Sequence, residues 1–202
     1  MRRAWIALLV ACATAAVTAA PQFVNVWKSP EVARLNFAGK NVAALVITDS
    51  QSLQMSGEEA LVRELSAHGV NAKATYRFVP GPELKSAETA KSWFERAKVE
   101  GVVALRPVSR QTEREYSPVV WGSSYYQSFW GYYGYGWHNA TVVRRSKDTT
   151  VVVVETLVYD LARDQLVWAA TSQTKDPGTL QEFVKDLVDA AVREMTKMKL
   201  VG

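Results

Sequence analysis

Residues 149–159 read TTVVVVETLVY, and this stretch does most to decide the fold. At the period of two that a strand imposes, apolar side chains fall on both of its faces, which is typical of a strand covered by helices above and below. Residues 160–165 then favour a turn, and residues 166–172, LVWAATS, return as its hairpin partner. The two runs predict neighbouring strands at the centre of a sheet.

The chain before this hairpin alternates between strand and helix patterns. Residues 41–48, NVAALVIT, and residues 71–79, NAKATYRFV, read as strands, and a third begins with residues 102–105 and extends towards Tyr116. We expect a first helix between the first two strands, opened by a capping box at Ser56 and Glu59, and a second helix over residues 86–100.

The chain after the hairpin predicts one more helix. Thr179 and Glu182 form another capping box, and apolar residues recur behind them at helical spacing. We therefore predict a single α/β domain with a mixed β-sheet, in the order β-α-β-α-β-insertion-β-β-α, with the helices packed on the sheet. At 202 residues the chain is long enough for one such domain.

The N-terminus has the layout of a secretory signal peptide. Arg2 and Arg3 precede an apolar run and then small residues, which predicts cleavage after Ala19. Alternatively, residues 9–12, LVAC, resemble a lipobox, so that residues 1–11 would be removed and Cys12 acylated. Residues 20–40 then form a lead to the domain at 41–202. We expect an exported protein of the periplasm or cell envelope, and outer-membrane anchoring if Cys12 is acylated.

Composition and motifs argue against several classes of function. Without Arg2 and Arg3 the net charge is only +2, too weak to favour nucleic-acid binding. The chain contains no Walker loop, GxGxxG, HExxH, GxSxG or CxxC motif. His68 and His138 have no second metal-ligating residue near them in sequence. We expect no catalytic residue, no metal site and no cofactor, and hence a protein that is not an enzyme.

The most unusual segment lies inside an insertion at residues 117–148. Residues 121–139, WGSSYYQSFWGYYGYGWHN, hold nine of the 21 aromatic residues and four of the 11 glycines, and no charge occurs from Ser117 to Val143. Because it links two strands, we interpret it as a projection whose removal would leave the domain folded. Tyrosine and tryptophan rings can stack on sugars, lie at a bilayer surface or pack on a protein. The candidate binding rings are Trp121, Tyr125, Tyr126, Trp130, Tyr132, Tyr133, Tyr135 and Trp137.

Basic residues flank this segment. Arg106, Arg110 and Arg114 are spaced by four, which places them on one face of a continuous strand. Arg144 and Arg145 would lie near Arg114 if the insertion closes a long hairpin. We therefore predict a basic collar of Arg114, Arg144 and Arg145 under an aromatic tip.

Several of these stretches resemble a family of small, largely uncharacterised bacterial envelope proteins, many of them lipoproteins. The resemblance rests on WKSPE at residues 27–31, AALVIT at 43–48, the Tyr- and Gly-rich insertion, and LVYDLARDQLVWAATSQT at 157–174. It covers nearly the whole chain after the N-terminal segment. It implies an α/β domain of unknown function, without an established activity or an agreed set of functional residues.

Three functions remain open from the sequence. The first is a non-enzymatic interaction or assembly module whose aromatic insertion contacts another envelope protein. The second is a module that binds a glycan or peptidoglycan, with the collar meeting anionic groups. The third is docking of the aromatic loop on a membrane surface. Membrane association would otherwise require lipidation at Cys12, and the sequence does not define the oligomeric state.

Overall fold

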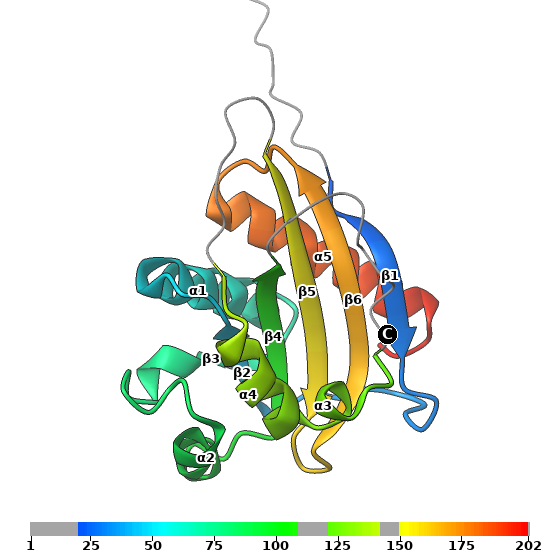
Figure 1. The fold of residues 1–202 in the computed structure, drawn as a ribbon. Coiled ribbons are helices and arrows are strands. Elements are labelled where there is room, and N and C mark those ends of the chain that lie inside the picture. Colours follow the sequence, from blue (N-terminus) through cyan, green and yellow to red (C-terminus); the bar gives the residue numbers. More distant parts are fainter. Residues whose placement is uncertain (1–19, 109–120, 142–149, 202) are drawn as a thin grey trace, which may run out of the picture.

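Six strands form one mixed sheet in the part of the chain that the computed structural model describes, residues 20–108, 121–141 and 150–201 (Figure 1). The strands are β1 (Gln22–Lys28), β2 (Asn41–Val46), β3 (Asn71–Ala74), β4 (Gly101–Val108), β5 (Val151–Asp160) and β6 (Gln165–Lys175). The helices are α1 (Gln51–Ala67), the 3-10 turn η1 (Thr75–Arg77), α2 (Ala87–Arg96), α3 (Ser124–Gln127), α4 (Phe129–His138) and α5 (Leu180–Lys197). The predicted α/β class and mixed sheet are confirmed.

The strand order is β1-β6-β5-β4-β2-β3. β2 pairs in parallel with both β3 and β4, as expected for strands that helices connect, whereas β4, β5, β6 and β1 pair antiparallel. The predicted hairpin is β5 and β6, joined by a turn in which Asp164 has a positive φ of 48°. The β-α-β-α-β half of the domain therefore lies beside an antiparallel half.

Helices cover both faces of the sheet, and β5 contributes to each. Val152, Val154 and Val158 face one apolar layer, which α1 and α5 complete. Leu157 and Tyr159 face the other, where α2, α3 and α4 pack. Figure 1 shows α3 and α4 in front of the sheet and α5 behind it. The prediction of a central strand apolar on both faces is confirmed.

Three predicted boundaries are wrong. The expected lead at residues 20–40 contains β1, which adds an edge strand by pairing with β6. α1 begins at Gln51 because the Ser50 hydroxyl accepts from the Leu53 amide at 3.3 Å; Ser56 lies inside the helix and donates to the Ser52 carbonyl oxygen. The strand predicted at residues 71–79 is β3, which ends at Ala74 because η1 follows it directly.

The capping box that opens α5 is confirmed. The Thr179 hydroxyl accepts from the Glu182 amide at 3.2 Å, and the Glu182 carboxylate accepts from the Thr179 amide at 2.9 Å. These contacts satisfy amide groups that the first turn of a helix would otherwise leave unpaired. None of the helices among the described residues combines the length and hydropathy that a bilayer-spanning segment needs.

Candidate ligand-binding site

The aromatic segment packs against the sheet instead of projecting from it. α3 and α4 cover the face formed by Ala43, Ala104 and Leu157. Six of the nine rings are buried, namely Trp121, Tyr126, Phe129, Tyr132, Tyr133 and Trp137. The interpretation of a removable projection is therefore wrong, because these rings are the core of this face. Removing them would uncover the sheet, so the domain is not expected to survive the deletion.

Three of the rings predicted to bind a ligand are not buried. Tyr125 is 38% exposed, and Trp130 and Tyr135 are half-buried. The centroids of the Tyr125 and Tyr135 rings lie 4.5 Å apart. The predicted collar residues Arg114, Arg144 and Arg145, and Cys12, lie outside the described residues, so the collar and the lipidation stay predictions.

Polar contacts from distant segments hold α4 in place. The Ser128 hydroxyl caps the helix by accepting from the Gly131 amide at 3.3 Å. The Asp164 carboxylate, from the β5–β6 turn, accepts from the Ser128 hydroxyl at 2.7 Å and from the Phe129 amide at 2.8 Å. The Tyr133 hydroxyl donates to the Leu84 carbonyl oxygen. α4 is thus anchored at its start and along its buried side.

A buried ion pair lies beneath α4. The Arg106 guanidinium on β4 donates to the Glu155 carboxylate on β5 at 2.9 and 2.7 Å, and both side chains are at most 5% exposed. The Tyr126 hydroxyl donates to the same carboxylate at 2.9 Å, and Arg106 also donates to the Asn139 carbonyl oxygen at 3.3 Å. Arg106 was predicted to share one strand face with Arg110 and Arg114, which lie outside the described residues. Arg106 itself is paired inside the protein, which suits a structural role.

The same environment keeps these groups in their ordinary protonation states. Burial raises the pKa values of the Tyr126 and Tyr132 hydroxyls, and the charge of Glu155 raises them further. Burial alone would lower the pKa of Arg106, but the neighbouring Tyr132 and Glu155 hold it above its ordinary value. The tyrosines therefore remain hydrogen-bond donors and Arg106 remains charged at any physiological pH.

The two histidines are not brought together. His68 ends α1 and its Nε2 lies 3.1 Å from the Asp189 carboxylate, whereas His138 is exposed at the end of α4. Among the described residues no group of three or more histidine, cysteine, aspartate or glutamate side chains is placed to hold a metal ion.

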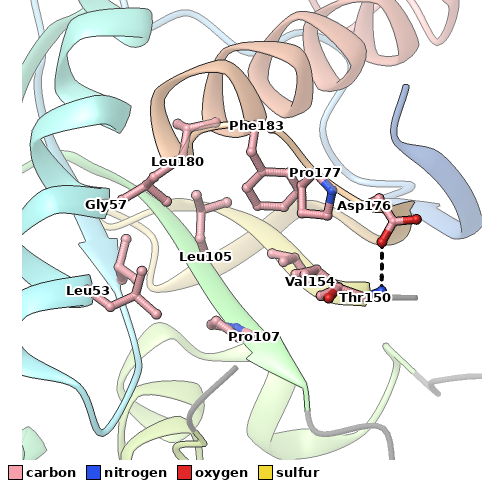
Figure 2. A pocket seen from close by; sticks show the side chains of 14 residues that line it. Leu53, Gly57, Leu105, Pro107, Thr150, Val154, Asp176, Pro177, Leu180 and Phe183 are labelled. Atoms are coloured by element: carbon pink, nitrogen blue, oxygen red, sulfur yellow. Dashed lines mark hydrogen bonds between the residues drawn. The ribbon is translucent and has the colours of Figure 1, made fainter. Parts of the chain in front are cut away.

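An apolar cavity of about 450 Å³ lies on the opposite face of the sheet, between α1 and α5. We call it the α1–α5 cavity. Figure 2 shows Leu53 of α1 and Leu180 and Phe183 of α5 facing Leu105 and Val154 of the sheet. Its lining is completed by Val46, Gly57, Pro107, Thr150, Val152, Asp176, Pro177, Gly178 and Val184. The cavity lies beside the carboxyl ends of the parallel strands β2 and β4, where open α/β sheets commonly bind ligands.

Thr150 and Asp176, the two residues of the described lining with polar side chains, bond each other. Thr150 donates its amide to the Asp176 carboxylate at 2.7 Å, the contact drawn as a dashed line in Figure 2, and the Asp176 amide donates to the Thr150 carbonyl oxygen at 2.6 Å. The amides at the start of α5 are capped by Thr179 and Glu182. The interior therefore offers a ligand apolar contact and little hydrogen bonding.

A buried carboxylate fixes one wall of this cavity. Glu58 of α1 accepts from the Val46 amide at 3.2 Å, the Tyr76 amide at 2.8 Å and the Gln54 side-chain amide at 3.1 Å. Burial raises the pKa of Glu58 from 4.5 to about 7, although these hydrogen bonds oppose the change. Glu58 thus ties α1 to β2 and η1 beside the cavity residues Val46 and Gly57.

The sequence did not identify this cavity, but it held one signal of it. Gly57 stands inside α1, where glycine costs about 1 kcal/mol relative to alanine. A Cβ atom at this position would lie 3.2 Å from Val46 Cγ2, so glycine lets the helix lie close to β2.

Comparison with known proteins gives similarities of fold. No family model matches the chain, and no curated protein matches it. Two solved PelC dodecamers from Paraburkholderia phytofirmans are similar. One, a point variant, has a TM-score of 0.44 and 13% identity over 80% of this chain and 89% of that chain. The other has a TM-score of 0.46 and 14% identity over 87% and 97%. Lipoprotein GNA1162 from Neisseria meningitidis has a TM-score of 0.38 and 12% identity over 78% and 99%.

Proposed function

We propose that the chain is a non-catalytic binding protein of the bacterial cell envelope, and that it holds an apolar group in the α1–α5 cavity. The observation that carries this proposal is the cavity itself. Its volume of about 450 Å³ lies within the range of about 300 to 1,000 Å³ that small-molecule sites occupy. The proposed location in the envelope rests on the signal-like N-terminal sequence.

The choice of this face follows from a difference in packing. On the opposite face the aromatic rings of α3 and α4 fill the layer, and binding there would require displacement of buried side chains. The α1–α5 cavity is partly open to solvent and its walls are apolar, so a ligand that enters it would remove apolar surface from water without displacing buried side chains.

The test uses a neutral hydrophobic fluorophore, N-phenyl-1-naphthylamine, and two matched tryptophan substitutions in α1. Leu53 lines the cavity and is half-buried, whereas Met55, two residues along the same helix, is 38% exposed and does not line it. We expect the wild type and Met55→Trp to bind the probe saturably. We expect Leu53→Trp to bind it at least about tenfold more weakly, a loss of about 1.4 kcal/mol.

Both variants carry one added tryptophan, so differences in fluorescence transfer or surface hydrophobicity cancel between them. Circular dichroism and thermal melting establish that both are folded. Equal binding by Leu53→Trp and Met55→Trp, or no saturable binding by the wild type, would show that the α1–α5 cavity is not a ligand site.

Glycan binding is retained as a second candidate because one aromatic pair stays accessible. The Tyr125 ring is 38% exposed and lies against Tyr135, which presents a flat surface on which a sugar could stack. Isolated peptidoglycan and soluble glycans added to the same titration would quench tryptophan fluorescence in the wild type. Tyr125→Ala would remove that quenching if the candidate is correct.

A further inference from the structure

Given the proposed function, on which this step rests, we infer that the α1–α5 cavity takes a single unbranched hydrocarbon chain whose head group carries no negative charge. Three properties of the cavity select this ligand from other apolar groups. They are the small number of polar side chains in its lining, the apolar space beyond Leu105, and the charge at the exposed side.

The interior favours a hydrocarbon chain over a peptide backbone. Of the described residues that line the cavity, only Thr150 and Asp176 have polar side chains, and the Asp176 carboxylate accepts from the Thr150 amide. A peptide group taken into such a site without a partner loses about 1 to 3 kcal/mol, because its hydrogen bonds to water are not replaced. A methylene group that enters the same site gains about 0.8 kcal/mol.

The shape favours an extended chain over a compact ligand. A second apolar void, of about 40 Å³, lies on the same face and shares Leu105 with the α1–α5 cavity. Leu61 and Leu65 of α1 and Leu187 of α5 line this second void. Apolar space between the two helices therefore lies on both sides of Leu105, in the direction of later turns of both helices. A chain in the α1–α5 cavity can extend in that direction until it meets the Leu105 side chain.

The charge at the exposed side disfavours an anionic head group. Asp176 is exposed and is the charged residue among the described residues that line the cavity. A carboxylate head near it would be repelled, which weakens binding by up to about five-fold at low ionic strength. Asp176 also has a positive φ of 43°, which asparagine adopts readily. Asp176→Asn therefore removes the charge while the amide oxygen can still accept from Thr150.

The experiment measures displacement of N-phenyl-1-naphthylamine at low ionic strength, with each competitor below its critical micelle concentration. The competitors are a twelve-carbon monoacylglycerol, the corresponding fatty acid, and an end-blocked leucine dipeptide. We expect the monoacylglycerol to compete about three-fold or more better than the fatty acid, and the dipeptide to compete poorly. Asp176→Asn should bring the two lipids to equal affinity.

A second variant tests the chain itself. Leu105→Val shortens the side chain between the two voids and should shift the preferred acyl length upwards, and thermal melting establishes that the variant is folded. Displacement by the dipeptide but not by the lipids would overturn the inference while the proposed binding function stands. Equal affinities of the two lipids for the wild type would also overturn it. Absence of saturable probe binding would instead remove the proposed function.

Discussion

The glycines of α4 provide a matched pair of positions to test how this helix packs. A Cβ atom built on Gly134 would have no neighbour within 4 Å, whereas one on Gly136 would lie 2.7 Å from Ile47 Cδ1 and 3.7 Å from Arg106 Cδ. Ile47 is fully buried, so its methyl group has little room to move. The structure therefore requires glycine at position 136 for a close approach of α4 to the sheet, and has no such requirement at position 134.

These contacts predict that the same substitution changes the stability of the protein in opposite directions at the two positions. Alanine is favoured over glycine inside a helix by about 0.8 to 1 kcal/mol, so Gly134→Ala should stabilise the protein by about that amount. Gly136→Ala receives the same gain but forces a methyl group into a packed layer, which costs about 1 to 3 kcal/mol. We expect Gly136→Ala to be destabilised by about 1 kcal/mol, and the two variants to differ by about 2 kcal/mol.

Urea denaturation followed by far-ultraviolet circular dichroism measures the difference, with thermal melting as a second readout. A difference of about 2 kcal/mol corresponds to roughly 4 to 8 °C in melting temperature for a chain of this size. Both variants change one hydrogen atom to a methyl group in the same helix, so helix propensity is controlled internally. If Gly136→Ala is stabilised as much as Gly134→Ala, α4 does not pack against Ile47 and the assigned core of this face is incorrect.

Two further predictions concern buried carboxylates. Glu155→Gln removes the counter-charge of buried Arg106 and should lower the free energy of unfolding by about 3 to 5 kcal/mol. Adding Arg106→Met to this variant should recover much of the loss, because no unpaired charge then remains buried. Urea denaturation of both variants measures the two changes. The pKa of Glu58 is raised from 4.5 to about 7 in the folded state. Its contribution to the free energy of unfolding is therefore complete below pH 4.5 and is lost as the pH rises through about 7. The wild type should therefore lose about 3 kcal/mol relative to Glu58→Gln between pH 4.5 and pH 8, and parallel stability profiles of the two proteins would contradict this.

The strand and helix order could be predicted because each element carries a local pattern. The run at residues 41–48 is a compact apolar stretch between turn residues, and β5 presents apolar side chains at period two on both faces. α5 combines a capping box with an apolar stripe. β1 was missed because its residues are mostly half-buried at the sheet edge, so it lacks the continuous apolar run of a central strand.

The aromatic segment was misread because its local sequence does not favour a helix. α4 contains three glycines and six aromatic residues in ten positions, and both types are weak helix formers. Its stability comes from contacts that sequence spacing does not reveal, such as the cap on Ser128 and Phe129 from Asp164 more than 30 residues away. The absence of charge from residues 117 to 143 was the informative signal, since a segment buried against a sheet excludes unpaired charges.

Hydrogen bonding also explains why binding is expected on the face of α1 and α5. On the aromatic face each buried tyrosine hydroxyl has a partner: Tyr126 and Tyr132 donate to Glu155, Tyr133 to the Leu84 carbonyl oxygen, and Tyr159 to that of Tyr126. A ligand that entered there would have to break these bonds as well as move the rings, and each unpaired hydroxyl would cost about 1 to 3 kcal/mol. The α1–α5 cavity imposes no such cost, because its walls are apolar and only Thr150 and Asp176 of its described lining have polar side chains. The aromatic segment, which composition marked as a binding surface, therefore stabilises the fold, and the face covered by α1 and α5 carries the cavity.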